Sequence, residues 1–192
     1  MKKILFICHG NICRSVMAEM VMKELCRKEG VEDLFEIDSA AVSREEIGND
    51  IYPPAKRKLR EKGIPFDHHA ARQITCADYT YYDYILCADR SNLRWLERII
   101  GEDTDRKVSL MMAWTMTNDR SPVTHTGNVP DVSDPWYTGD FETAYRDIEQ
   151  SCRAICTFIM SHISEKCRDN ENNAVFSCVC QKKAVPLQPN SE

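Results

Sequence analysis

KKILFI at residues 2–7 runs directly into CHGNICRS at residues 8–15. The first stretch has the apolar character of a buried strand, and the second places Gly10 in a short loop before the apolar pattern of a helix. Ligands of parallel α/β sheets bind outside the carboxyl ends of the strands, which is where such a loop lies. The stretch therefore predicts an α/β fold with a phosphate-binding loop after its first strand.

Apolar runs and helical patterns alternate along the rest of the chain. Strands are predicted at residues 3–7, 35–40, 82–88 and 107–111. Helices are predicted at residues 15–27, 52–63 and 91–100, and again after Asp140. This alternation predicts a doubly wound fold, in which a four-stranded parallel sheet is flanked by helices.

The composition predicts one folded domain, because 43% of the 192 side chains are hydrophobic. We expect that domain to cover residues 1–163 and a polar, loosely ordered C-terminal tail to cover residues 164–192. The chain has no apolar stretch near the roughly 20 residues of a membrane helix. Its first ten residues contain too short an apolar segment for a secretion signal. We therefore expect a cytoplasmic protein with no membrane contact.

The net charge and the number of cysteines argue against some classes of protein. A net charge of -5 argues against a chain built to hold nucleic acid, although it allows a local anion site. Ten cysteines could form a disulfide scaffold, but such scaffolds are typical of small secreted chains, so we interpret these as reduced thiols. Cys26, Cys152 and Cys156 have the spacing of core residues. The cysteine and histidine spacings predict no zinc site.

The loop at residues 8–15 has the residues of an oxyanion site. Backbone N–H groups of a tight turn, together with the start of a helix, form a cradle for phosphate or a mimic of it. The same donors favour the thiolate of a cysteine at the base of the cradle, which makes Cys8 a candidate nucleophile. Arg14 could hold two phosphoryl oxygens in a bidentate fork, a geometry that lysine cannot copy.

The spacing of Cys8 and Arg14 is weak evidence by itself, because about one such pair is expected by chance in a chain of this composition. The position of this pair in the sequence is stronger evidence for a functional loop. The pair follows the first predicted strand, encloses Gly10 and precedes Ser15 at a helix start. These agreements favour a functional loop over an incidental cysteine at a strand end.

A second candidate segment is DVSDPWYTGDF at residues 131–141. Cysteine chemistry on a phosphate ester needs an acid for the leaving oxygen, and Asp134 is the candidate, with Asp131 as the alternative. An aspartate before proline is commonly a turn residue. However, Trp136 and Tyr137 are large aromatic residues in a turn, where they could form the walls of a slot for an aromatic substrate.

With these residues the chain resembles the low-molecular-weight protein tyrosine phosphatases, of the bacterial type. CHGNICRS is the signature loop and DPWY the acid loop, and DSAAVS, HAARQIT and CADRSN occur in the family's order. The resemblance extends to about residue 163, which makes residues 1–163 the phosphatase domain. It implies hydrolysis of phosphotyrosine and aryl phosphate monoesters, with phosphotyrosine-containing proteins as substrates and with no metal or cofactor. We expect a monomer.

The resemblance also implies roles for individual residues. Cys8 is the nucleophile that carries a phosphocysteine, Arg14 binds phosphate, and Asp134 is the acid and then the base. The substrate-binding residues are His9, Gly10, Asn11, Ile12, Cys13, Trp136 and Tyr137. Asn11 also joins Ser15, Ser39 and His69 in the network that supports the loop. Cys13 either packs beneath the loop or pairs with Cys8 on oxidation, as adjacent loop cysteines do in the family.

Other interpretations stay open. A thioredoxin-coupled arsenate reductase would use the same loop with Cys76 and Cys87, although Cys87 ends an apolar run. Protein arginine phosphatases carry threonine in place of Ile12. A non-enzymatic anion-binding or thiol redox module would need neither a nucleophile nor an acid. Glu45 replaces an aromatic rim residue of mammalian relatives, which predicts a more acidic cleft mouth. Asp89 and Asn92 require no more than a helix-capping role.

Overall fold

The computed structural model describes residues 1–116 and 128–169, with side chains described as far as residue 163. The chain separates into two units, residues 1–156 and residues 157–192. The predicted C-terminal tail lies outside the described residues from residue 170 onward.

The first unit is built on a parallel sheet. Its strands are β1 (Lys2–Cys8), β2 (Phe35–Ala41), β3 (Tyr84–Cys87) and β4 (Val108–Leu110), in the order β2-β1-β3-β4. All three pairings are parallel, as predicted. Residues 4–7 of β1 are fully buried because β1 lies inside the sheet with both faces covered. The predicted fold class is confirmed.

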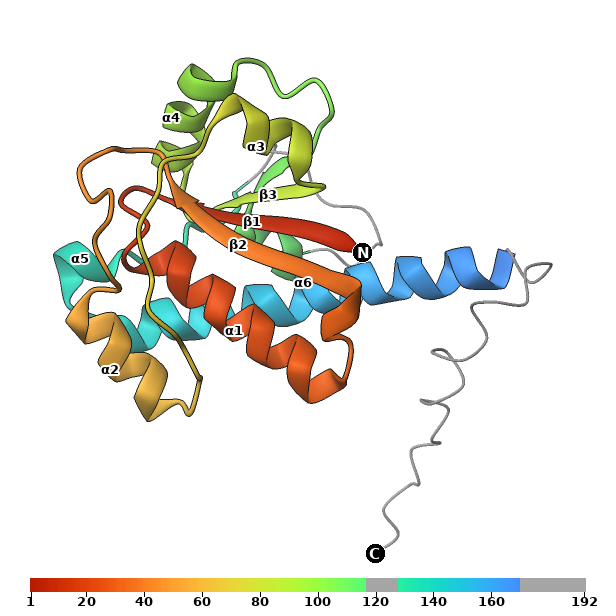
Figure 1. Cartoon of the computed structure of the whole chain (residues 1–192), viewed down its shortest axis with the longest axis horizontal. Helices are drawn as coiled ribbons and strands as arrows, with labels where there is room; N and C mark the ends of the chain where they lie inside the picture. Colours follow the sequence, from red (N-terminus) through yellow and green to blue (C-terminus); the bar gives the residue numbers. More distant parts are fainter. Residues whose placement is uncertain (117–127, 170–192) are drawn as a thin grey trace, which may run out of the picture. The chain divides into compact units, whose positions relative to one another are not determined.

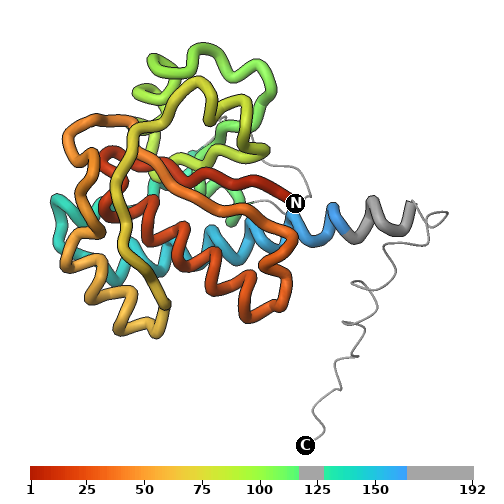
Figure 2. Tube along the Cα trace, viewed as in Figure 1, coloured from red at the N-terminus to blue at the C-terminus, as the bar shows by residue number. Residues whose placement is uncertain are grey.

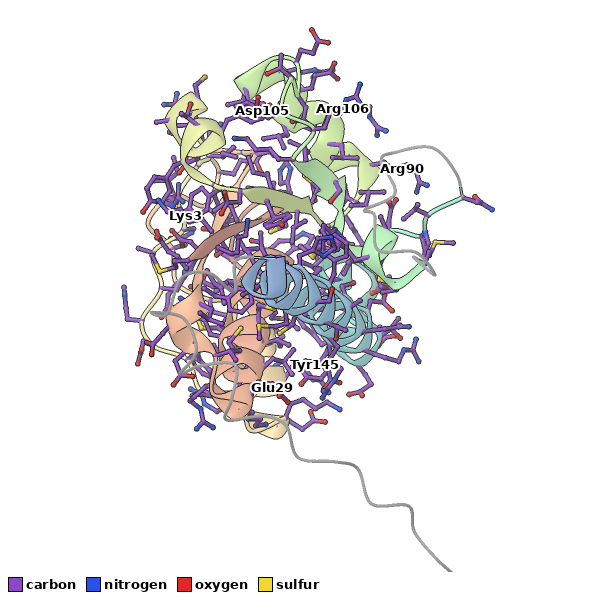
Figure 3. All side chains as sticks on the ribbon, turned by 90° about the vertical axis from the view of Figure 1, so that its right-hand side faces the viewer. Lys3, Glu29, Arg90, Asp105, Arg106 and Tyr145 are labelled. Carbon is purple, nitrogen blue, oxygen red and sulfur yellow. The ribbon has the colours of Figure 1, made fainter. Side chains whose placement is uncertain are left out.

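Helices cover both faces of the sheet (Figure 1). The described helices are α1 (Arg14–Glu29), α2 (Pro53–Glu61), α3 (Cys76–Tyr81), α4 (Arg90–Ile100), α5 (Pro135–Thr138) and α6 (Phe141–Asp169), with 3₁₀ helices at Glu32–Leu34 and Met111–Met116. α1 and residues 141–156 of α6 lie on one side of the sheet, and α3 and α4 lie on the other. Figure 3 shows this arrangement with Tyr145 on α6 and with Asp105 and Arg106 in the turn before β4.

The chain leaves β1 toward β2 on one side and returns to β3 on the other. This reversal makes the carboxyl end of β1 a topological switch point, where a crevice forms between the diverging connections. Residues 9–13 occupy that position, between β1 and α1, and Figure 2 follows them in red. The fold therefore places the predicted loop where ligands of such sheets bind.

Two short helices were not predicted. α3 has six residues and α5 has four, which is too short to show an apolar period. α3 is instead fixed by a capping box, in which Thr75 and Asp78 exchange hydrogen bonds. α5 follows Asp134, whose side chain caps its first turn. The residue pattern T-x-x-D was the available signal for α3.

Candidate active site

Cys8 is the last residue of β1 and is only 3% exposed. Its Sγ lies 3.0 Å from Ser15 Oγ and accepts a hydrogen bond from the Asn11 N–H at 3.3 Å. α1 begins six residues later, and its N-cap residue Cys13 makes no side-chain hydrogen bond to the first turn. The start of α1 is thus suited to hold an anion beside the sulfur.

Asn11 holds the loop in a tight shape. Its φ of 59° lies in the left-handed region, which asparagine tolerates better than most residues. Its side-chain Nδ2 donates to Ser15 Oγ at 3.0 Å and to Ser39 Oγ at 2.8 Å. Its Oδ1 accepts the Arg72 N–H at 3.1 Å, and its backbone oxygen accepts from His69 Nε2 at 2.8 Å. The predicted support residues therefore gather around Asn11, together with Arg72, which was not predicted.

A buried carboxylate ends this network. Ser39 Oγ donates to Glu19 Oε2 at 2.6 Å, and Glu19 also pairs with Lys23 at the surface of α1. Glu19 is buried although charged side chains rarely are, so its burial depends on these partners. Glu19 was not predicted from the sequence. The available signal was a glutamate four residues after Ser15 on the same face of a helix.

Arg14 is 4% exposed and sits between two carboxylates. Its Nη1 lies 2.6 Å from Asp89 Oδ2, and its Nη2 lies 2.7 Å from Asp134 Oδ2. Burial lowers the pKa of Arg14, but the negative charges of Cys8, Asp134 and Asp89 outweigh burial and raise it, so the guanidinium stays charged. Asp89 also caps α4 by accepting the Asn92 N–H at 2.7 Å. Asp89 therefore does more than the capping role assigned from sequence.

Asp134 connects the acid segment to the loop. One carboxylate oxygen accepts the Trp136 N–H at 3.0 Å, and the other contacts Arg14. Trp136 is 54% exposed, and its ring centre lies 5.0 Å from that of Tyr52, while Tyr137 is 85% exposed. The carboxylate and the exposed rings thus stand together at the loop.

A cleft joins these groups. Its lining residues come from the loop after β1, the segment after β2 and the start of α5: Cys8, His9, Gly10, Ile12, Cys13, Arg14, Glu45, Glu46, Asp134, Trp136 and Tyr137. The predicted residues Asn11, Ser15, Ser39 and His69 are not in this lining, because they lie in the supporting network. Asp131 pairs with Arg90 at 3.1 Å and is not in the lining either.

The comparisons identify the family of this chain. The family model for low molecular weight phosphotyrosine protein phosphatases matches residues 3–168. The chain belongs to this family. The family hydrolyses phosphotyrosine, so the predicted protein tyrosine phosphatase is confirmed at this level.

Relatives cover most of this phosphatase. The low molecular weight phosphotyrosine protein phosphatase of Gallus gallus is 39% identical over 158 residues, which are 80% of this chain and 92% of the relative. The protein-tyrosine-phosphatase YfkJ of Bacillus subtilis is 33% identical over 159 residues. Its crystal structure matches with a TM-score of 0.74 over 84% of this chain and 96% of YfkJ. A drosophila arginine phosphatase matches at 29% identity with a TM-score of 0.68, over 82% and 96% of the two chains.

The described residues offer neither a metal site nor a membrane-spanning helix. Among residues 1–116 and 128–163, no group of three or more His, Cys, Asp or Glu side chains could hold a metal ion. No helix in the described part of the phosphatase is long and apolar enough to cross a membrane.

The thiols of the phosphatase differ in their surroundings. Burial raises the pKa of Cys13, and the charges of Cys8 and Asp134 raise it further. Because its pKa is raised, the Cys13 thiol is protonated at neutral pH. Cys26, Cys152 and Cys156 are buried, as expected of core residues.

Trp136→Ala is expected to raise KM for a small aryl phosphate by roughly twofold to tenfold, because one wall of the cleft is lost. Its kcat should change by less than about twofold, since the carboxylate of Asp134 stays in place. Trp136→Phe, which keeps a ring, should recover most of the affinity. Steady-state kinetics on the three proteins measure this effect. An unchanged KM with a collapsed kcat would show that Trp136 only shapes the acid segment.

Proposed function

We propose that this chain hydrolyses phosphotyrosine in proteins in two steps, with Cys8 as the nucleophile. In the first step the Cys8 sulfur forms a bond to phosphorus, the bond from phosphorus to the aryl oxygen breaks, and Asp134 gives its proton to that oxygen. In the second step Asp134 takes a proton from water, the water oxygen attacks phosphorus, and the phosphorus–sulfur bond breaks. Phosphate and the free thiolate are released.

The observation that carries the proposal is the meeting of Cys8, Arg14 and Asp134 in one cleft. These residues come from two segments about 120 positions apart in the sequence, and mere anion binding would need neither the thiol nor the acid. Asp89 binds only the Nη1 atom of Arg14, whereas Asp134 contacts the Nη2 atom. A phosphoryl oxygen that enters the cleft can therefore replace Asp134 at Nη2. Asp134 is then released toward the leaving oxygen.

The supporting network has a chemical role in this scheme. Ser15 Oγ, 3.0 Å from the sulfur, can donate to the thiolate that leaves in the second step. Asn11 keeps its strained backbone because each polar group of its side chain is bound. The hydrogen bonds of Asn11 therefore hold the loop in this shape before phosphate arrives, and such preorganisation favours binding.

The geometry favours aryl phosphates over the two enzymatic alternatives. Trp136 and Tyr137 offer ring surfaces, and Ile12 lines the cleft where arginine phosphatases carry threonine. Cys87, the thiol that an arsenate reductase would need, is fully buried in the sheet, and burial raises its pKa well above the ordinary value. The predicted monomeric state and cytoplasmic location stay predictions.

One experiment tests the proposed function. The same preparation is assayed with a metal chelator against an aryl phosphate, a phosphoserine peptide, phosphoarginine and arsenate. We expect the aryl phosphate to be hydrolysed fastest without added metal, because Arg14 and the loop N–H groups supply the positive charge. Faster hydrolysis of phosphoarginine than of the aryl phosphate would show that the chain is an arginine phosphatase. Turnover of none of the four would indicate a binding module.

Cys13→Ser is expected to lose activity permanently after peroxide, whereas the wild type should recover with thiol reductant. Peroxide oxidises the Cys8 sulfur to a sulfenic acid and is reduced to water, and the Cys13 thiol then displaces a second water to form the disulfide. Because burial raises the pKa of Cys13, closure should speed up as pH rises. Activity is followed through both treatments. Equal recovery of the two proteins would remove the protective role of Cys13.

A further inference from the structure

Two glutamates border the cleft beside the phosphate loop. Glu45 and Glu46 belong to the segment that follows β2, and both line the cleft. A Cβ atom placed on Gly10 would lie 3.0 Å from Glu46 Cγ, so the Glu46 side chain rests on the loop itself. The Glu46 charge also helps to raise the pKa of Cys13. Glu46 is therefore close enough to act on charges inside the cleft.

Neither glutamate is balanced by a lysine or arginine of the cleft lining. Glu46 accepts a hydrogen bond from Asn49 Nδ2 at 2.6 Å, which is a neutral donor. Glu45 is 72% exposed and pairs with His9 Nε2 at 3.1 Å. Arg44 precedes them in the sequence but does not line the cleft. The mouth of the cleft thus carries excess negative charge on its β2 side.

The charge inside the cleft does not compensate for the glutamates. The guanidinium of Arg14 already faces two carboxylates, those of Asp89 and Asp134. A phosphoryl group bound at Arg14 adds further negative charge to the cleft. Apart from His9, which pairs with Glu45, and Arg14, the cleft lining has no basic side chain, so a basic group of the substrate, outside its phosphotyrosine, can supply positive charge to the two glutamates.

The substrate chain necessarily crosses the mouth. When the phosphoryl group lies in the loop and the ring lies against Trp136, the main chain of a phosphotyrosine segment leaves the cleft at its rim. Neighbouring side chains then fall within reach of the rim residues. Lysine and arginine are long enough to reach an exposed carboxylate, whereas a glutamate at the same place would be repelled.

We infer that Glu45 and Glu46 select phosphotyrosine segments with lysine or arginine next to the phosphotyrosine, over segments with acidic neighbours. This inference rests on the proposed function and names the substrate class of the same cleft. Because the charges meet at an exposed rim, the preference should weaken as ionic strength rises.

The test compares three phosphotyrosine peptides whose flanking residues are lysine, glutamine or glutamate. For the wild type at low salt we expect kcat/KM to be about tenfold higher with lysine than with glutamate. In Glu45→Gln/Glu46→Gln the ratio should fall to within about twofold. Glu102→Gln removes an exposed carboxylate beyond the C-terminal end of α4 and serves as the matched control. Its lysine-to-glutamate ratio should equal that of the wild type.

Each outcome is decisive because every ratio is measured within one protein. If the double variant does not fold, Glu45→Gln alone, on a mostly exposed side chain, should still lower the ratio. A wild-type ratio near one, or a ratio that the double variant keeps, would overturn the inference. If the wild type hydrolyses phenyl phosphate but has equal kcat/KM for the lysine and glutamate peptides, only this inference is contradicted. A wild type that hydrolyses neither phenyl phosphate nor any peptide contradicts the proposed function.

Discussion

Cys8→Ser is expected to lower the hydrolysis of aryl phosphates by more than about 10⁴-fold, because a serine hydroxyl at this position has no base to activate it. Phosphate binding should persist. The N–H of Asn11, the start of α1 and Arg14 all remain in place around the substituted atom. Steady-state kinetics give the first effect, and calorimetric titration with inorganic phosphate gives the second.

Cys76→Ser is the matched control, because Cys76 is an exposed thiol on α3 whose Sγ contacts the Ile99 carbonyl at 3.3 Å. This variant should keep full activity. If Cys8→Ser retained activity within about tenfold of the wild type, the attacking group would not be the Cys8 sulfur.

Asp134→Ala is expected to lower kcat by about 10²- to 10⁴-fold for substrates with a poor leaving group, the range typical of general acid loss. The loss should be smaller for an acidic phenol, because its oxygen leaves without a proton. A series of aryl phosphates with graded leaving groups, assayed on wild type and variant, measures this dependence.

Asp134 also caps α5, so the acid role must be separated from the structural one. Asp134→Asn can still accept the Trp136 N–H but has no acidic proton, and we expect it to behave like Asp134→Ala. Asp131→Ala removes the alternative carboxylate, which pairs with Arg90, and should stay near wild-type activity. Equal losses for good and poor leaving groups would show that Asp134 is structural.

Much of the fold could be predicted because its signals are local. The apolar run of β1 ends at Cys8, the prolines at the start of α2 mark a helix N-terminus, and Gly30 ends α1 in the left-handed conformation. α3 and α5 escaped prediction because helices of six and four residues show no apolar period. Their formation depends on caps and on the surrounding packing.

The site was predictable only in part, for a similar reason. Cys8 and Arg14 share one loop, so their spacing was visible in the sequence. The contact of Asp89 with Arg14 joins residues 75 positions apart, and Arg72 reaches Asn11 across 61 positions. The first contact follows from strand order, which places β3 beside β1. The second follows from the bridge between Ala41, at the end of β2, and Gln73, which brings Arg72 to the loop. The rule that parallel strands end at one edge could have indicated Asp89, because it follows β3 closely.

Cys8 is expected to carry the phosphoryl group during turnover, and a trapping experiment can detect it there. The enzyme is mixed rapidly with an aryl phosphate, quenched in denaturant during turnover and digested, and the modified peptide is located by mass spectrometry. We predict a phosphoryl group on Cys8, and none on that peptide in Cys8→Ser. Rapid turnover without a covalent intermediate, or a phosphoryl group on His9 instead, would show that the Cys8 sulfur is not the attacking group.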